Sequence, residues 1–130
     1  MRFEVNVEDQ YTEFKLLEEN LNSRISPDLK AEFVKRDFRN LILNLSKVKY
    51  ADSSGLSAIL RANKLCQDRD GVLVICCPQP HVEKLIKISQ LQTVLNILPT
   101  QEEAIEAVFM HEVENEILNK QDGTDPISPN

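Results

Sequence analysis

Apolar and polar residues alternate twice near the start of the chain, over residues 3–7 and again over residues 12–16. A period of two is typical of a strand with one buried face. The residues between the two stretches are polar and form a short link. The pattern therefore predicts a β-hairpin at the N-terminus.

Three later runs are almost entirely apolar, at residues 41–45, 72–76 and 94–98. Short apolar runs without alternation predict strands that are buried on both faces, as in parallel sheets. We expect the first two runs to be central strands and the third to be the last strand of the sheet.

Apolar residues recur at helical spacing between and after these strands. The predicted helices cover residues 26–37, 56–66, 81–88 and 100–119. Ser26 is a residue type that can cap the first helix. Pro27 follows it, and Pro is favoured at the first helical position. Thr100 and Glu103 have the spacing of a capping box that opens the last helix.

The alternation of strands and helices predicts an α/β fold. Its sheet would be mixed, with the N-terminal hairpin plus parallel strands, and about four helices would cover it. The length of 130 residues fits one domain. We expect this domain at residues 1–119, with an extended C-terminal helix, and a disordered tail at residues 120–130, which contain Gly and two Pro.

The amino-acid composition argues against some classes of binding partner. The net charge is −6, and an acidic surface disfavours nucleic acid and anionic membranes as partners. The N-terminus has no apolar signal segment, and no apolar run is long enough to cross a membrane, so we expect a cytoplasmic protein without membrane insertion.

Metal and cofactor sites are not expected. The three cysteines, Cys66, Cys76 and Cys77, lack the spacing of a metal site and suit a reducing compartment as free thiols. His81 and His111 are far apart in the sequence. With only three Gly in the chain, neither a phosphate-binding loop nor a dinucleotide fingerprint is present.

The segment Asp52-Ser53-Ser54-Gly55 follows a predicted strand and precedes a predicted helix. Functional groups in α/β sheets gather at the carboxyl ends of strands, where two adjacent hydroxyls would be exposed. Gly55 would let another molecule approach them closely. Asp and Ser before a helix are also ordinary caps, and spacing alone favours that structural role.

A hydrolase is disfavoured by the same segment. Ser54 lacks the Gly of a GxSxG nucleophile elbow, and neither His follows in a context that places it as a base. A small enzyme with a Ser53 or Ser54 nucleophile would need a base within hydrogen-bond reach. We therefore predict no catalytic residue and no enzymatic activity.

The run at residues 41–46, followed by Tyr-Ala-Asp-Ser-Ser-Gly-Leu at residues 50–56, resembles the signature of STAS domains, the anti-sigma factor antagonist family. The resemblance covers about residues 3–110, and the Asp-Ser-Ser-Gly-Leu core is its most specific part. Supporting similarities lie at residues 17–22, 26–29 and 88–91. The chain departs from the family pattern with Glu19 and Gln90, where Gly is usual, and with Asn22, where Asp is frequent.

The resemblance implies a bacterial protein-binding switch that regulates transcription indirectly. Ser54 would be the phosphoacceptor, with Ser53 secondary. Unphosphorylated protein would sequester an anti-sigma factor that is also a serine kinase of the histidine-kinase-like ATPase type, and a serine phosphatase would reverse the modification. The partner-binding residues would be Asp52, Ser53, Ser54, Gly55, Leu56 and Asn22.

The same resemblance leaves a second role open. STAS domains also serve as accessory or scaffold subunits, in a stress-signalling complex or with a phospholipid transporter. In that role the same surface would dock constitutively.

Overall fold

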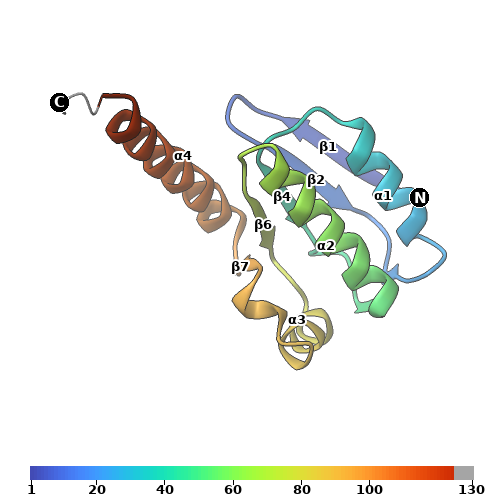
Figure 1. The fold of residues 1–130 in the computed structure, drawn as a ribbon. Coiled ribbons are helices and arrows are strands. Elements are labelled where there is room, and N and C mark those ends of the chain that lie inside the picture. The colour runs from blue at the N-terminus through green and yellow to red at the C-terminus, as the bar shows by residue number, and fades with distance from the viewer. Residues whose placement is uncertain (125–130) are drawn as a thin grey trace.

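The computed structural model describes residues 1–124, with side chains up to Leu118 (Figure 1). The strands are β1 (Phe3–Val7), β2 (Thr12–Leu16), β3 (Asn20–Leu21), β4 (Leu41–Asn44), β5 (Tyr50–Ala51), β6 (Leu73–Cys76) and β7 (Asn96–Leu98). The helices are α1 (Ser26–Lys35), α2 (Ser53–Asp68), α3 (Pro80–Ile88), the short 3₁₀ helix η1 (Leu91–Thr93) and α4 (Gln101–Thr124).

The main sheet has the strand order β1-β2-β4-β6-β7. β1 pairs with β2 in antiparallel fashion, and every other neighbouring pair in this sheet is parallel. This arrangement confirms the predicted mixed sheet with an N-terminal hairpin. β3 and β5 form a separate parallel pair that the sequence pattern did not predict.

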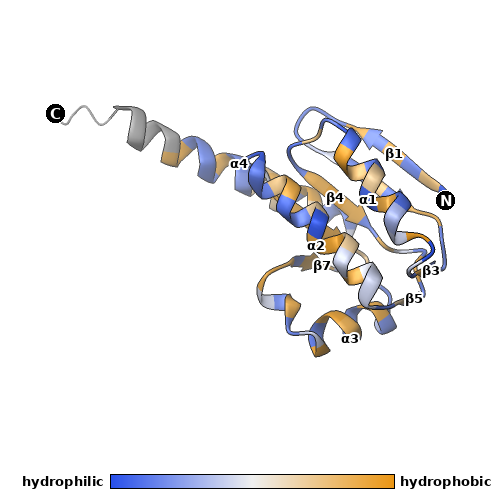
Figure 2. Ribbon diagram, turned by 45° about the vertical axis from the view of Figure 1, so that its right-hand side comes forward, coloured by the Kyte–Doolittle hydropathy of each residue, from blue (hydrophilic) through white to orange (hydrophobic). Residues whose placement is uncertain are grey.

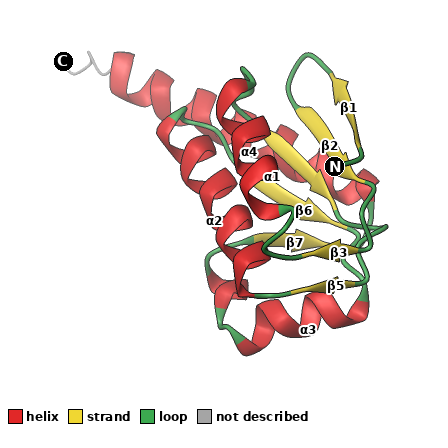
Figure 3. Ribbon diagram, turned by 90° about the vertical axis from the view of Figure 1, so that its right-hand side faces the viewer, coloured by secondary structure: helices red, strands yellow, loops and turns green. Residues whose placement is uncertain are grey.

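Alternate side chains of the central strands face two different layers of helices, as the pleat of a strand requires. On one face, Leu41 and Leu43 of β4 belong to the main core, together with residues of α1, α2 and α3. On the other face, Ile42 packs in a smaller cluster with Ala104 and Val108 of α4. Figure 3 shows α1 and α2 next to each other on one side of the strands of the sheet.

Polar contacts fix the start and the middle of α4. Thr100 Oγ1 accepts a hydrogen bond from the Glu103 backbone N–H at 3.1 Å, which confirms the predicted capping pair. The buried Glu13 carboxylate accepts hydrogen bonds from Asn44 Nδ2 at 2.9 Å and from Gln101 Nε2 at 2.6 Å. It thereby joins β2 and β4 to the first turn of α4, which then extends away from the sheet (Figure 2).

Several helices and strands begin or end at other residues than the sequence pattern predicted. α1 ends at Lys35, and its N-cap position is Ile25; the prediction that Ser26 caps the helix was wrong, because its hydroxyl donates to the Asn22 carbonyl at 2.8 Å. β7 begins at Asn96, since η1 precedes it. Of the predicted tail, residues 120–124 continue the backbone of α4, and residues 125–130 lie outside the described residues.

Candidate functional site

Asp52 determines where α2 begins. Its backbone is extended, with φ −121° and ψ −171°, and its side-chain Oδ1 accepts a hydrogen bond from the Gly55 N–H at 3.1 Å. A carboxylate that accepts from an otherwise unpaired amide of the first turn is an N-cap. The helix therefore starts at Ser53, three residues earlier than the apolar pattern indicated.

With the cap supplied by Asp52, neither Ser53 nor Ser54 is needed for that role. Ser53 is exposed and Ser54 is partly exposed, in the first turn of α2. Among the side chains that the structure describes, neither hydroxyl makes a hydrogen bond. Both hydroxyls are thus available for interaction or modification at a helix N-terminus.

Gly55 and Leu56 have an internal role. Gly55 is buried, and a Cβ atom placed on it would lie 2.5 Å from the backbone oxygen of Leu21. Leu56 is only 7% exposed and belongs to the main core. The expectation that Gly55 makes room for a partner needs correction, because its open side is filled by β3 of the same chain. Asp52, Ser53 and Ser54 are at least partly exposed, whereas Gly55 and Leu56 are buried and keep the segment in place.

The β3–α1 segment forms the second wall of the site. β3 pairs in parallel with β5, with Leu21 opposite Ala51, and the Asp52 N–H donates to the Leu21 carbonyl at 3.2 Å. This pairing brings the partly exposed Asn22 next to the start of α2. The Asn22 side chain is bonded locally, since Oδ1 accepts from the Arg24 N–H at 3.0 Å.

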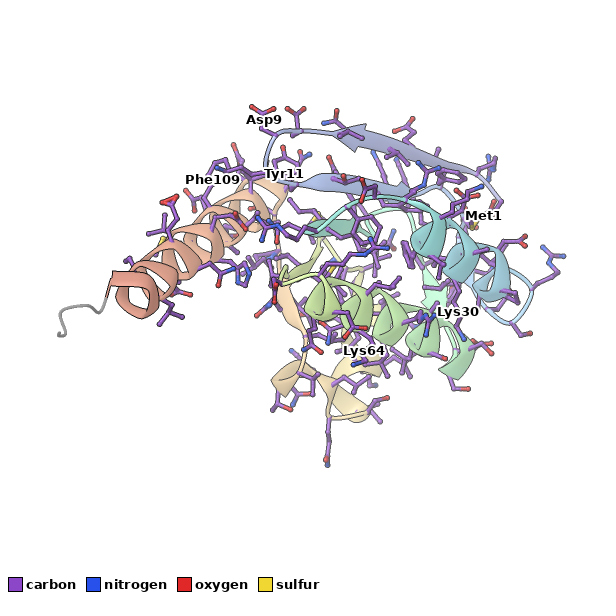
Figure 4. The ribbon with its side chains drawn as sticks, turned by 45° about the horizontal axis from the view of Figure 1, so that its top comes forward. Met1, Asp9, Tyr11, Lys30, Lys64 and Phe109 are labelled. Atoms are coloured by element: carbon purple, nitrogen blue, oxygen red, sulfur yellow. The ribbon has the colours of Figure 1, made fainter. Side chains whose placement is uncertain are left out.

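An open hollow separates the two walls. It is lined by Ser23, Ser26, Pro27, Lys30, Ser53, Ser54 and Ser57. Lys30 is the single charged residue of this lining, and its Nζ donates to Ser57 Oγ at 3.0 Å. Figure 4 shows Lys30 between α1 and α2.

Lys30 and Ser57 were not foreseen from the sequence. Both lie outside the Asp-Ser-Ser-Gly segment, and Lys30 reaches the site only because α1 packs on α2. Electrostatically, the hollow combines one ammonium group with the N-terminus of a helix whose first turn carries no acidic residue. Such a place tolerates an added anion.

No group of three or more His, Cys, Asp or Glu among residues 1–124 is arranged to hold a metal ion. No helix within the same stretch is both long and apolar enough to cross a membrane.

The chain belongs to the STAS domain family, whose profile matches residues 11–104. Among curated relatives, BtrV of Bordetella bronchiseptica, named as an anti-sigma factor antagonist, is 30% identical over 67% of this chain and 78% of its own length. The anti-sigma F factor antagonist of Paenibacillus polymyxa is 30% identical over 61% of this chain and 65% of its own length. By homology, the chain is thus related to anti-sigma factor antagonists.

Solved structures share the fold. A crystal structure of an anti-sigma factor antagonist candidate from Thermotoga maritima has a TM-score of 0.72 and 25% identity, and the match covers 82% of this chain and 93% of that one. Bacillus SpoIIAA in its phosphorylated form has a TM-score of 0.59 and 20% identity, over 82% of this chain and 99% of that one. A sulfate transporter family protein from Wolinella succinogenes, 13% identical, has a TM-score of 0.70 over 82% and 90% of the two chains. The last two likenesses concern the fold alone.

Proposed function

We propose that this chain is an anti-sigma factor antagonist that works as a phosphorylation-controlled binding switch, with Ser54 as the phosphoacceptor and Ser53 as a secondary site. The observation that carries the proposal is the pair of hydroxyls in the first turn of α2 that form no hydrogen bond within the described part of the chain, where Asp52 already caps the helix. Family membership and the antagonist names of the curated relatives support it.

A phosphate on Ser54 would leave the domain folded. A phosphoserine carries about −1.5 to −2 charges at neutral pH and three acceptor oxygens. The N-terminus of α2 favours an anion, and Lys30 across the hollow supplies a positive charge. Asp52 is the nearest carboxylate in sequence, and its negative charge repels the phosphate. The positive charge of the Lys30 ammonium group offsets this repulsion.

The same phosphate would prevent binding. A partner that packs on neutral Ser53 and Ser54 would have to bury a bulky dianion without a compensating charge, and an unpaired buried charge costs several kcal/mol. A loss of about 3 kcal/mol already weakens binding more than a hundredfold. One modification is therefore sufficient to release a complex.

The proposed partners follow from the family. Unphosphorylated protein would sequester an anti-sigma factor that is also a serine kinase of the histidine-kinase-like ATPase type, and a serine phosphatase would restore the binding form. The chain itself needs no catalytic base, because the kinase supplies the machinery for phosphoryl transfer.

The test is intact-protein mass spectrometry after incubation with ATP and the histidine-kinase-like ATPase encoded nearest to this chain. We expect one added phosphate, mapped to Ser54, that is absent in Ser54→Ala and retained in Ser53→Ala. The matched control is Ser57→Ala, which removes a hydroxyl from the same hollow one turn further along α2.

Failure of every such kinase to phosphorylate Ser54 would count against the switch. Constitutive docking of the same surface, as an accessory or scaffold subunit, would then be the better account.

A further inference from the structure

Apolar and acidic side chains are exposed together on α4, and two of the apolar ones, Phe109 and Val113, also line a hollow against residues 8–11 of the hairpin turn. Phe109, Met110, Val113 and Ile117 are each exposed to between 45% and 58%, although large apolar side chains are normally buried in a domain of this size. Phe109, Val113 and Ile117 lie four residues apart and form one stripe along the helix. Residues 101–118 contain six Glu and no Lys or Arg.

The carboxylates of this helix are largely uncompensated. Glu112 is the only one of them with a salt bridge in the described part of the chain, and its partner is Arg39. We call the exposed apolar residues Phe109, Met110, Val113 and Ile117 and the glutamates around them the α4 ridge.

A groove of opposite character runs between α1 and α2. It is lined by Lys30, Ala31, Val34, Lys35, Ser57, Leu60, Arg61 and Lys64. Val34 is 48% exposed and Leu60 is 37% exposed, so the groove has an apolar centre between cationic side chains. Figure 4 labels two of these residues, Lys30 of α1 and Lys64 of α2.

The groove has a net positive charge even after its salt bridges are taken into account. Lys35 and Lys64 form salt bridges with Glu32 and Asp68, at 2.9 Å and 3.0 Å. Lys30 donates only to a neutral hydroxyl, and Arg61 has no salt bridge among the side chains that the structure describes. In a chain with a net charge of −6, this concentration of cations on one face is a local exception.

We infer that the α4 ridge of one copy docks in the α1–α2 groove of a second copy. A single helix fits the space between two packed helices, the apolar stripe would cover Val34 and Leu60, and glutamates would meet lysines and arginine. Complementary charge of this kind steers association and sets its register. The inference does not require modification of Ser54, although Lys30 and Ser57 line both the groove and the hollow beside Ser54.

The contact has to join two molecules. α1 and α2 cover one face of the sheet and α4 covers the other, so the ridge and the groove of one chain cannot meet. Pairing of two α4 ridges would bring glutamates without a salt bridge in the described part of the chain against the same glutamates of the other copy, which like-charge repulsion opposes. The association is therefore head-to-tail, and such contacts form rings or open chains.

Sedimentation of the full chain tests the inference, with two variants that each remove one surface. Leu60→Glu with Arg61→Glu changes the groove, and Val113→Gln with Ile117→Gln changes the ridge; all four positions are exposed. Matched controls on α3, Lys84→Glu and Ile88→Gln, lie on neither surface, and Ile88 is 68% exposed.

We expect wild type and both controls to associate as concentration rises from micromolar to millimolar, more weakly at high salt. Each double variant alone should associate at least about tenfold more weakly, which corresponds to about 1.4 kcal/mol. An equimolar mixture of the two variants should form a one-to-one complex that grows no further, because only one intact ridge and one intact groove remain. This complex also shows that both variants are folded.

Wild type that stays monomeric over the whole range would overturn the inference, and the ridge would then be left for a cationic partner. Variants that associate like wild type, or a mixture that forms no one-to-one complex, would overturn it as well.

Discussion

Gly55 of α2 lies against the backbone of Leu21 in β3, so closely that a Cβ atom at residue 55 would stand 2.5 Å from the Leu21 oxygen and 2.7 Å from its Cγ. The contact links the start of the helix that carries Ser54 to the short strand that precedes α1. Positions of the two walls of the site are therefore coupled through a residue without a side chain.

Replacement of Gly55 by Ala should destabilise the fold. Ala is the better helix former by about 1 kcal/mol, but the added methyl meets backbone, which cannot move aside as a flexible side chain can. Overpacking of this kind costs about 1–3 kcal/mol. We expect a lower urea midpoint for Gly55→Ala, while Gln67→Ala at an exposed position of the same helix should remain close to wild type. A stability gain in Gly55→Ala would contradict the close approach.

Removal of the Asp52 N-cap of α2 should also lower the stability of the fold by a measurable amount. Asp52→Ala deprives the Gly55 N–H of its acceptor and should cost about 1 kcal/mol, whereas Asn at this position caps nearly as well as Asp. Urea denaturation of Asp52→Ala and Asp52→Asn gives the comparison. An unchanged stability in Asp52→Ala would mean that a serine takes over the cap, and would weaken the argument that both hydroxyls are free for another role.

A permanent negative charge at residue 54 should weaken partner binding. Aspartate is smaller than phosphoserine and carries one charge, so we expect Ser54→Asp to lower the affinity for the cognate anti-sigma kinase by about tenfold or more, or at least about 1.4 kcal/mol. Ser54→Ala should bind like wild type, because it adds neither charge nor bulk. Calorimetry with the purified kinase measures both. Equal affinities of Ser54→Asp and wild type would count against the switch.

The sequence predicts the parts of this fold that have a clear period. The hairpin alternates over five residues on each side, and β4 and β6 are apolar runs, so pattern alone identifies them. β3 and β5 have two residues each, which is too short for any periodicity to appear. The role of Gly55 depends on that pair, and therefore could not be inferred from its neighbours in sequence.

The candidate site also has one part that the sequence predicts and another that only the folded structure shows. Asp52, Ser53 and Ser54 are consecutive and could be recognised as one segment. Lys30 reaches Ser57 only through the packing of α1 on α2, across 27 positions of sequence. The positive charge in the hollow thus depends on the packing of α1 on α2, and no local sequence motif predicts it.

The cysteines should differ in reactivity in the folded protein. Burial raises the pKa of Cys66 to about 12 and also raises the pKa of Cys76, and the thiolate is the reactive form. Cys77 is partly exposed. We expect iodoacetamide at mildly alkaline pH to label Cys77 first, with all three sites labelled in urea, as mapped by mass spectrometry. Rapid labelling of Cys66 in the native state would show that the core around α2 opens readily.

Glu112 should make the docking of α4 sensitive to acid. Its carboxylate accepts hydrogen bonds from Arg39 and, at 2.8 Å, from Asn40 Nδ2. Partial burial raises the pKa of Glu112, but these two hydrogen bonds and the Arg39 charge outweigh it and hold the pKa below the usual value of 4.5. Folding therefore favours the charged form of this group.

The sign of the pH effect follows from that lowered pKa. The stabilisation is fully present above the usual pKa of 4.5 and is lost as the pH falls through the lower pKa of the folded chain. Because the Arg39 side chain is 43% exposed, solvent screening limits the contribution to about 1 kcal/mol. Glu112→Gln should thus be less stable than wild type at neutral pH, and the difference in free energy of unfolding should shrink below pH 4.5. Glu114→Gln, at an exposed position of the same helix, should show no such convergence. A difference that stays constant across this range would mean that the carboxylate charge contributes nothing to holding α4 on the sheet.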